Sequence, residues 1–186
     1  WAAQEGSRIA LLFAATYPDR TSALVLYDPT ARGLWAPDYP WAPTDEVWRR
    51  ELREIRDRWG DRDYLVERGH RLSPFGAQNA EWLDWFVWYM RRSASPAEAV
   101  AFHRMSMEGD VREVLGAVRA PTLVLHREEM RDEAAYVAER VAGARRVEVE
   151  GLHDWFSWAD PERNAVLLRE MHEFLENLST PREPDR

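Results

Sequence analysis

The sequence predicts an α/β protein: a small parallel sheet of about three strands with flanking helices and a helical insertion. Two short apolar runs, 23–27 and 122–126, are typical of buried parallel strands. Segments with helical spacing of apolar residues precede the first run and follow the second, so helix and strand alternate. Residues 44–118, between the two runs, contain helical segments separated by Gly, Ser and Pro, which indicates an inserted helical region.

The remaining elements follow from the same spacing. Apolar residues recur at helical intervals over 6–17, and Pro18 ends that helix. Residues 131–142 form an amphipathic pattern that Gly143 stops. Period-two alternation over 146–150 predicts an outer strand, and a last helix is expected from Pro161, with Asp160 as its cap, to about Leu178.

Composition excludes several classes of function. The net charge of −8 argues against nucleic acid and anionic membrane as partners. Cys is absent, so disulfides and thiolate metal sites are excluded, and a cytoplasmic location is expected. No apolar run reaches the roughly 18 residues of a membrane span. Since no phosphate loop, metal motif or nucleotide fingerprint occurs, we expect neither a metal nor a cofactor.

Three segments carry a family resemblance. Residues 9–18 (IALLFAATYP), 23–27 (ALVLY) and 120–127 (APTLVLHR) resemble the α/β-hydrolases often found beside or fused to adenylate or guanylate cyclase domains, and 143–145 and 151–158 continue the match in order. The resemblance implies a partial α/β-hydrolase fold with four parts: the nucleophile-elbow helix, strand and exit loop of the core (1–40), a helical cap insertion (41–118), the C-terminal core (119–178) and a disordered tail (179–186).

The family's nucleophile is substituted. Its strand ends in Gly-x-Ser-x-Gly before a sharp turn into a helix, and the five corresponding residues here are Ala2-Ala3-Gln4-Glu5-Gly6. Gln4 therefore stands at the nucleophile position, where a primary amide cannot accept an acyl group. Ser7 lies inside the first helical turn and is expected to point away from the turn. Glu5 is a candidate pocket residue, with a solvated or capping role as the alternative.

His153 is the candidate base, because the family keeps its catalytic His just after the last strand. The usual order is Asp-His, and here it is His153-Asp154, so an ungapped alignment places Asp154 at the base position. A half-exposed loop histidine is the alternative interpretation of His153.

The candidate acid is displaced as well. The resemblance places the acid near Met130, which cannot orient an imidazole, and Asp132 fits better as a helix cap. Asp28 follows the strand 23–27, and in related branches such as the haloalkane dehalogenases the acid follows this strand. Asp28 and His153 could form an acid–base pair; alternatively, Asp28 only starts a turn with Pro29.

An aromatic stripe marks the helical insertion. Trp82, Trp85, Phe86 and Tyr89 share one helical face. Such a stripe is either ordinary core or the lid of an apolar pocket for a small molecule, with Trp155 beside His153 as the opposite wall.

The resemblance supplies only the last three of the family's eight strands. Strand 23–27 would then have an unpaired inner edge, which seeks a partner. We expect this edge to be covered in a homodimer, by a missing N-terminal segment or by a partner chain that completes the sheet.

Three hypotheses of function result. The first is a hydrolase-fold protein with lost or altered serine hydrolysis that binds a small apolar molecule. The second is an enzyme, such as an ester or epoxide hydrolase, a lyase or a proton-transfer enzyme, that uses Asp28 and His153. The third is an incomplete fragment of an ordinary α/β-hydrolase.

Overall fold

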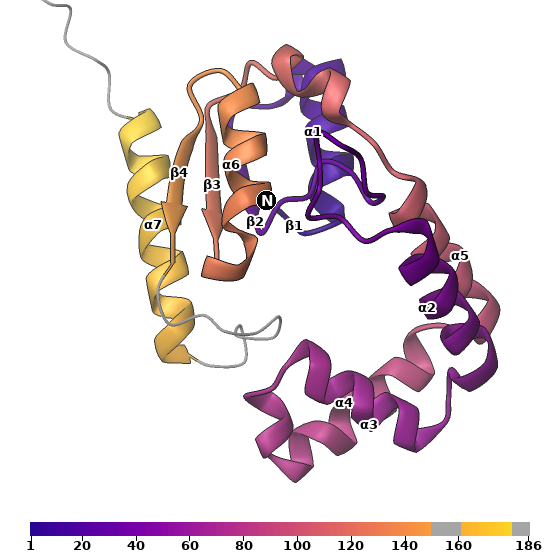
Figure 1. Ribbon diagram of the computed structural model, residues 1–186. Helices are drawn as coiled ribbons and strands as arrows, with labels where there is room; N and C mark the ends of the chain where they lie inside the picture. Colours follow the sequence, from indigo (N-terminus) through magenta and orange to yellow (C-terminus); the bar gives the residue numbers. More distant parts are fainter. Residues whose placement is uncertain (150–160, 180–186) are drawn as a thin grey trace, which may run out of the picture. The chain divides into compact units, whose positions relative to one another are not determined.

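The computed structural model describes residues 1–149 and 161–179, which form two compact units. Among the described residues, the first unit contains 1–30, 113–149 and 161–179, and the second contains 31–112 (Figure 1). The first unit holds the sheet, and the second holds four α-helices.

The sheet of the first unit has four parallel strands in the order in which they occur along the chain. They are β1 (Ala2–Ala3), β2 (Leu24–Tyr27), β3 (Thr122–His126) and β4 (Arg145–Glu148). Every residue of β2 and β3 is buried, which explains why these two strands are continuous apolar runs in the sequence. The predicted α/β class with a parallel sheet is confirmed.

Strand β1 corrects one expectation. Ala2 pairs with Leu26 and Ala3 pairs with Tyr27, so the described sheet has four strands and the inner edge of β2 is partly covered. The expectation of a wholly unpaired edge at 23–27 was wrong, because the two residues before the turn at Gln4 join the ladder themselves. A strand of two residues has no periodicity for sequence analysis to detect.

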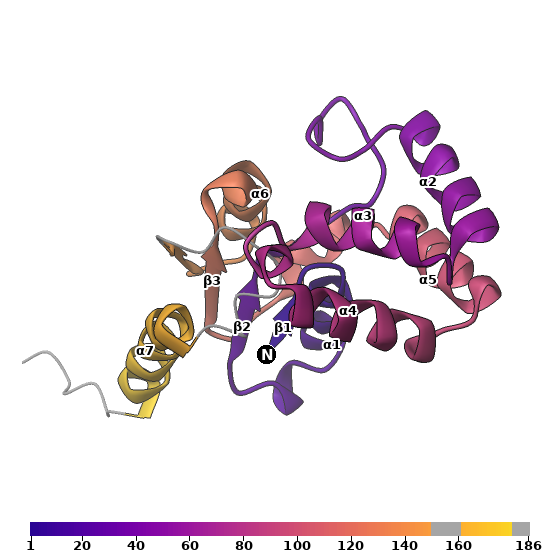
Figure 2. The same ribbon diagram turned by 90° about the horizontal axis from the view of Figure 1, so that it is seen from below.

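Three helices belong to the first unit: α1 (Gly6–Thr16), α6 (Arg131–Arg140) and α7 (Pro161–Ser179). Helix α1 connects β1 to β2, and α6 connects β3 to β4. Helices α6 and α7 lie on opposite sides of the β3–β4 part of the sheet (Figure 2). The expected cap Asp132 lies inside the first turn of α6, whose N-cap is Met130.

The second unit contains α2 (Asp45–Arg58), α3 (Arg62–Leu72), α4 (Ala80–Ser93) and α5 (Pro96–Glu108). Polar side chains cap all four N-termini, which lowers the cost of unpaired backbone N–H groups; the caps are Thr44, Asp61, Asn79 and Ser95. Among the helices that the structure describes, none is both long and apolar enough to cross a bilayer.

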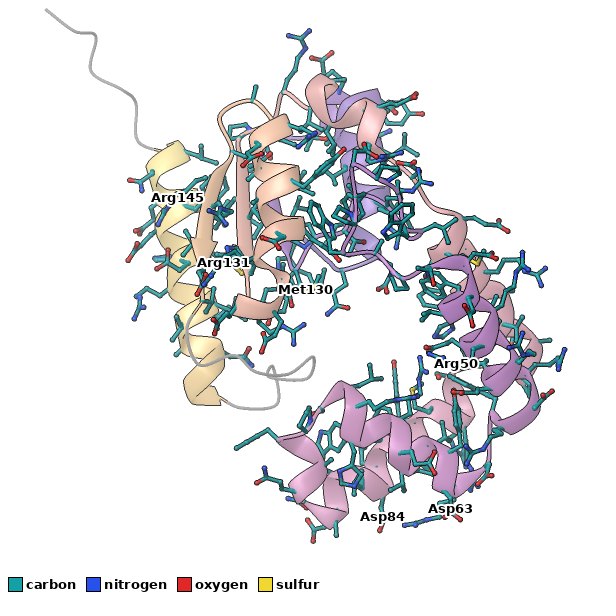
Figure 3. All side chains as sticks on the ribbon, viewed as in Figure 1. Arg50, Asp63, Asp84, Met130, Arg131 and Arg145 are labelled. Atoms are coloured by element: carbon teal, nitrogen blue, oxygen red, sulfur yellow. The ribbon has the colours of Figure 1, made fainter. Side chains whose placement is uncertain are left out.

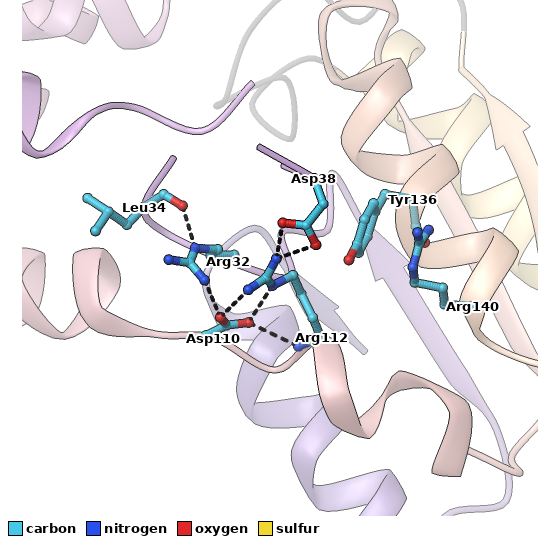
Figure 4. A network of polar contacts seen from close by, with 7 residues as sticks. All are labelled: Arg32, Leu34, Asp38, Asp110, Arg112, Tyr136 and Arg140. Carbon is cyan, nitrogen blue, oxygen red and sulfur yellow. Dashed lines mark hydrogen bonds and ion pairs between the residues drawn. The ribbon is translucent and has the colours of Figure 1, made fainter. Parts of the chain in front are cut away.

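The entry and exit of the second unit are joined by a polar network (Figure 4). Arg112 forms ion pairs with Asp38 and Asp110, and Asp110 also pairs with Arg32 at 2.6 Å. The backbone N–H of Val111 donates to the carbonyl oxygen of Ala31 at 2.8 Å. The segments that open and close the helical unit are therefore held together within that unit.

Candidate functional site at the carboxyl ends of the strands

Gln4 forms the turn between β1 and α1. Its φ is 49°, one of two positive values among the described non-glycine residues, and its side chain is buried. Its N–H donates to the carbonyl oxygen of Tyr27, and its carbonyl oxygen accepts from the N–H of Ser7, both at 2.9 Å. A side chain held at positive φ costs about 1–3 kcal/mol and marks positions where the surrounding structure imposes the turn.

The neighbours of Gln4 are placed by the start of α1. Ser7 is fully buried, and its Oγ has no hydrogen-bond partner among the described residues. Its hydroxyl therefore lies behind the turn and is not presented at its tip. Glu5 is the N-cap of α1, and its side chain makes no capping hydrogen bond, which leaves the candidate pocket role of Glu5 a prediction.

Asp28 occupies the equivalent place at the end of β2. Its φ is 46° and its side chain has 0% exposure. One carboxylate oxygen accepts from the backbone N–H of Arg127 at 2.9 Å, and the other accepts from Arg127 Nε at 2.6 Å. Burial raises the pKa of Asp28, and the charge and hydrogen bonds of Arg127 oppose that rise.

Sequence analysis missed Arg127, which binds Asp28 and ties the end of β2 to the end of β3. The signal was present in the sequence, because an acid directly follows one buried strand and a base directly follows the next. Carboxyl ends of neighbouring parallel strands meet at one edge of a sheet. Beside this pair His126 is buried, and its Nδ1 donates to the carbonyl oxygen of Arg127 at 2.8 Å.

The strand register brings these groups into one row. Ala3, Tyr27 and Leu125 are partners across β1, β2 and β3, so the next residues, Gln4, Asp28 and His126, share one edge of the sheet. Within the described residues, no group of three or more metal-binding side chains lies together. The row offers an amide, an ion-paired carboxylate and an imidazole.

Met130 stands where the resemblance places the acid. It immediately precedes α6, and the adjacent Arg131 forms an exposed ion pair with Glu148 (Figure 3). The uncharged thioether of Met130 cannot accept a hydrogen bond strong enough to orient a base.

Solved structures with the same arrangement of elements identify the fold. The chain is similar to an esterase from Exiguobacterium antarcticum (17% identity, TM-score 0.72) over 96% of this chain and 65% of that one. It is also similar to an enol-lactonase from Burkholderia xenovorans, with 19% identity and a TM-score of 0.70. This match includes 94% of this chain and 64% of that one. A third similar structure is an α/β-hydrolase enzyme from a deep-sea metagenome library, with 17% identity and a TM-score of 0.64. The match includes 99% of this chain and 66% of that one.

The chain has a partial α/β-hydrolase fold. It spans less than two thirds of the length of these solved structures. No protein-family model and no curated protein matches the sequence.

The remaining candidate residues include three that the structure does not describe and the aromatic residues of the helical unit. His153, Asp154 and Trp155 lie outside the described residues, so the pairing of His153 with Asp28 stays a prediction. The aromatic candidates lie on α4 of the helical unit, whereas the turn at Gln4 belongs to the sheet unit.

Within α4 the aromatic side chains stack in pairs four residues apart. Trp82 lies on Phe86 with 5.2 Å between ring centroids, and Trp85 lies on Tyr89 at 5.4 Å. Phe86 is fully buried and Tyr89 is exposed, so the stripe passes from the core of the unit to its surface.

Proposed function

We propose that this chain is an α/β-hydrolase-fold protein without serine hydrolase chemistry that binds a small apolar molecule. The observation that carries the proposal is Gln4, which takes the strained turn between β1 and α1 with φ of 49°. In enzymes of this fold, such a turn presents the nucleophilic oxygen. An amide at that place supplies a hydrogen-bond donor and acceptor but no nucleophile.

The serine next in line does not replace it. Ser7 Oγ is buried on α1, and a hydroxyl acts as a nucleophile only when it reaches the substrate and an adjacent base. The similar solved structures include an esterase and an enol-lactonase, which hydrolyse acyl–oxygen bonds. We therefore expect this chain to bind a ligand and not to turn it over by acyl transfer.

The apolar character of the ligand is supported by the aromatic stripe on α4. The paired rings of Trp85 and Tyr89 form a rigid apolar surface. Ligand pockets are lined predominantly by such side chains, with a few polar groups that fix orientation.

An acid–base enzyme that pairs Asp28 with His153 is the second hypothesis. Both carboxylate oxygens of Asp28 already accept hydrogen bonds from Arg127. Each oxygen keeps a further lone pair, so an imidazole could still donate to it. The third hypothesis, an incomplete copy of an ordinary hydrolase, is compatible with coverage of 64–66% of the solved structures.

A fluorophosphonate probe tests the central claim. The intact mass of the chain should be unchanged after treatment, whereas an active serine hydrolase treated in parallel gains one adduct. Gln4→Ser tests whether the turn still presents its side chain, with Gln4→Ala as the matched control: slow labelling at position 4 alone is expected. Stoichiometric labelling of the unaltered chain at Ser7, or at any other serine, would contradict the proposal.

Binding is tested separately with indole as an apolar probe. Ligand-observed NMR should show indole binding that Trp85→Ala weakens, while the matched change at the exposed Trp35 has no effect. Absence of indole binding by the unaltered chain would overturn the ligand part of the proposal and leave the nucleophile part standing.

A further inference from the structure

Three polar side chains from α2, α3 and α5 meet inside the helical unit, and we call them the Arg68 cluster. Arg68 of α3 is buried, with 8% exposure of its side chain. Its Nη1 donates to Oε1 of Glu51 on α2 at 2.6 Å, and its Nη2 lies 2.7 Å from Nε2 of His103 on α5. All three residues belong to the helical unit, so the cluster is formed within one compact body.

The hydrogen bonds of His103 determine the protonation state of its ring. Nδ1 lies 2.8 Å from the carbonyl oxygen of Ala99, which can only accept a hydrogen bond, so Nδ1 carries a proton. The guanidinium of Arg68 can only donate, so Nε2 must offer its lone pair. Edge-on contacts with the rings of Trp59 and Phe102, at 6.4 Å and 5.6 Å between centroids, hold the imidazole in this orientation. The ring is therefore neutral, with its proton on Nδ1.

A proton on Nε2 would place two N–H donors against each other. Arg68 would lose an acceptor, and its Nε is already buried without a hydrogen-bond partner among the described residues. Leaving a further buried donor unpaired is unfavourable, and the two positive charges repel each other. Protonation of His103 should therefore break its contact with Arg68.

The charges that face His103 from the neighbouring helices are positive in sum. Glu51 on α2 attracts a proton to the ring, but Glu51 is already bound to Arg68, and Arg71 on α3 adds a second positive charge beside it. The hydroxyl of Tyr64, which accepts from Arg68 Nη1 at 3.4 Å, is uncharged. Helix α4 contributes uncharged side chains to the core beside α5, namely Val87 and Met90. Two positive charges against one negative charge favour the neutral ring.

We propose that His103 is a pH-sensitive switch, which ties α3 to α5 when it is neutral and releases α3 when it is protonated. Helix α3 in turn supports the aromatic stripe of α4, because Gly69 packs closely against Phe86. Acid should thus loosen α3, α4 and α5, while the sheet unit keeps its own contacts. The switch lies within the helical unit and does not rest on the function proposed above.

The direction and size of the effect follow from proton linkage. A free imidazole takes up a proton near about pH 6.5, so the opened unit binds a proton below this pH and the closed unit excludes it. The stability is therefore complete above about pH 7.5 and falls with the pH, by at most about thirtyfold in the opening equilibrium at about pH 5. Since His103 is half-buried, water screens part of the repulsion, and we expect about tenfold.

Hydrogen exchange at about pH 8 and about pH 5, corrected for the intrinsic exchange rate at each pH, measures this opening. The unaltered chain should open about tenfold more at the lower pH in α3 and α5, with no such loss of protection in β2 and β3. Arg68 holds the pKa of Glu51 below its ordinary value, so Glu51 stays ionised at both pH values.

Two matched variants separate the switch from a merely structural role. In His103→Gln, an amide oxygen that does not titrate can accept from Arg68, so the protection should remain and its pH dependence should disappear. His70→Gln makes the same change at an exposed histidine of α3 and should leave the pH dependence intact.

Nitrogen NMR of the histidine rings provides a second measurement, which needs no variant. At about pH 7.5 the ring of His103 should carry its proton on Nδ1 and none on Nε2. If His103→Gln does not fold, this measurement and the pH dependence of the unaltered chain decide.

Equal protection of α3 and α5 at both pH values would overturn the inference, as would a pH dependence that His103→Gln retains or that His70→Gln removes. A proton on Nε2 of His103 at neutral pH, or an equal loss of protection in β2 and β3, would also overturn it. None of these outcomes affects the fluorophosphonate test at Gln4.

Discussion

Arg127→Met should destabilise the sheet unit strongly, because it leaves the carboxylate of Asp28 buried without its counter-ion. The Asp28 side chain has 0% exposure and that of Arg127 has 11%, so solvent screens the pair little. Removing one partner of a buried pair costs about 3–5 kcal/mol. One backbone N–H remains bound to Asp28 in the variant, so we expect the lower end, about 3 kcal/mol.

Hydrogen exchange followed by mass spectrometry measures this change in each unit separately. A loss of about 3 kcal/mol corresponds to roughly a hundredfold faster exchange where amides open with the whole unit. The effect is expected in β2 and β3, while α2 and α3 of the second unit keep their protection. The double variant Asp28→Asn/Arg127→Met should regain about 2 kcal/mol, since no charge is then left buried.

Arg131→Met is the matched control, because Arg131 also pairs with a carboxylate, that of Glu148 at 2.9 Å, but at the surface with 52% exposure. Such pairs contribute about 0–1 kcal/mol. Equal effects of Arg127→Met and Arg131→Met, or a double variant less stable than Arg127→Met alone, would refute the reasoning.

Three further predictions concern other positions. Gln4→Gly should raise stability by about 1 kcal/mol in urea denaturation, because glycine adopts positive φ without strain, and a loss would show that the amide makes essential contacts. Gly33→Ala should cost about 3 kcal/mol, since its Cβ would lie 1.8 Å from the carbonyl oxygen of Ser106; the control Gly116→Ala meets nothing within 4 Å and should be near neutral. Burial raises the pKa of Glu51, but the hydrogen bond and charge of Arg68 outweigh this effect and hold the pKa below its ordinary value. The stability that this pair contributes is therefore present above about pH 4.3 and is lost as the pH falls further. Tryptophan fluorescence against urea at several pH values should show this dependence, and Glu51→Gln should flatten it.

Sequence alone was sufficient for elements defined by local spacing. The run at 122–126 was expected as a strand because continuous apolar residues fit a strand covered on both faces, and β3 has these bounds. Helix α1 was equally visible from its periodicity and from Pro18, which follows it. Local rules succeed where burial imposes a pattern on consecutive residues.

The candidate site was harder to predict because its contacts are not local. Asp28 and Arg127 are 99 residues apart, and their pairing depends on β2 and β3 being neighbours in register. Gln4 was identified as a site position because the segments that follow it resemble the α/β-hydrolases. A glutamine in isolation does not indicate a strained turn. Periodicity identified α1 as a helix but did not show which side is covered, because Ile9, Leu12 and Phe13 are exposed while Ser7 and Arg8 are buried beside Leu11 and Ala14.

The joined ends of the helical unit have a consequence for how this protein can change. Gly33 N–H donates to Gly109 O at 2.9 Å, close to the bond between Val111 and Ala31. The segments at 31–33 and 109–111, which begin and end the helical unit, therefore lie side by side. Joining them by a short turn would cost little loop-closure entropy. The helical unit could be exchanged or deleted at these paired segments without altering the register of β2 and β3. Recombination at 31 and 112 could then vary the module while the sheet stays constant.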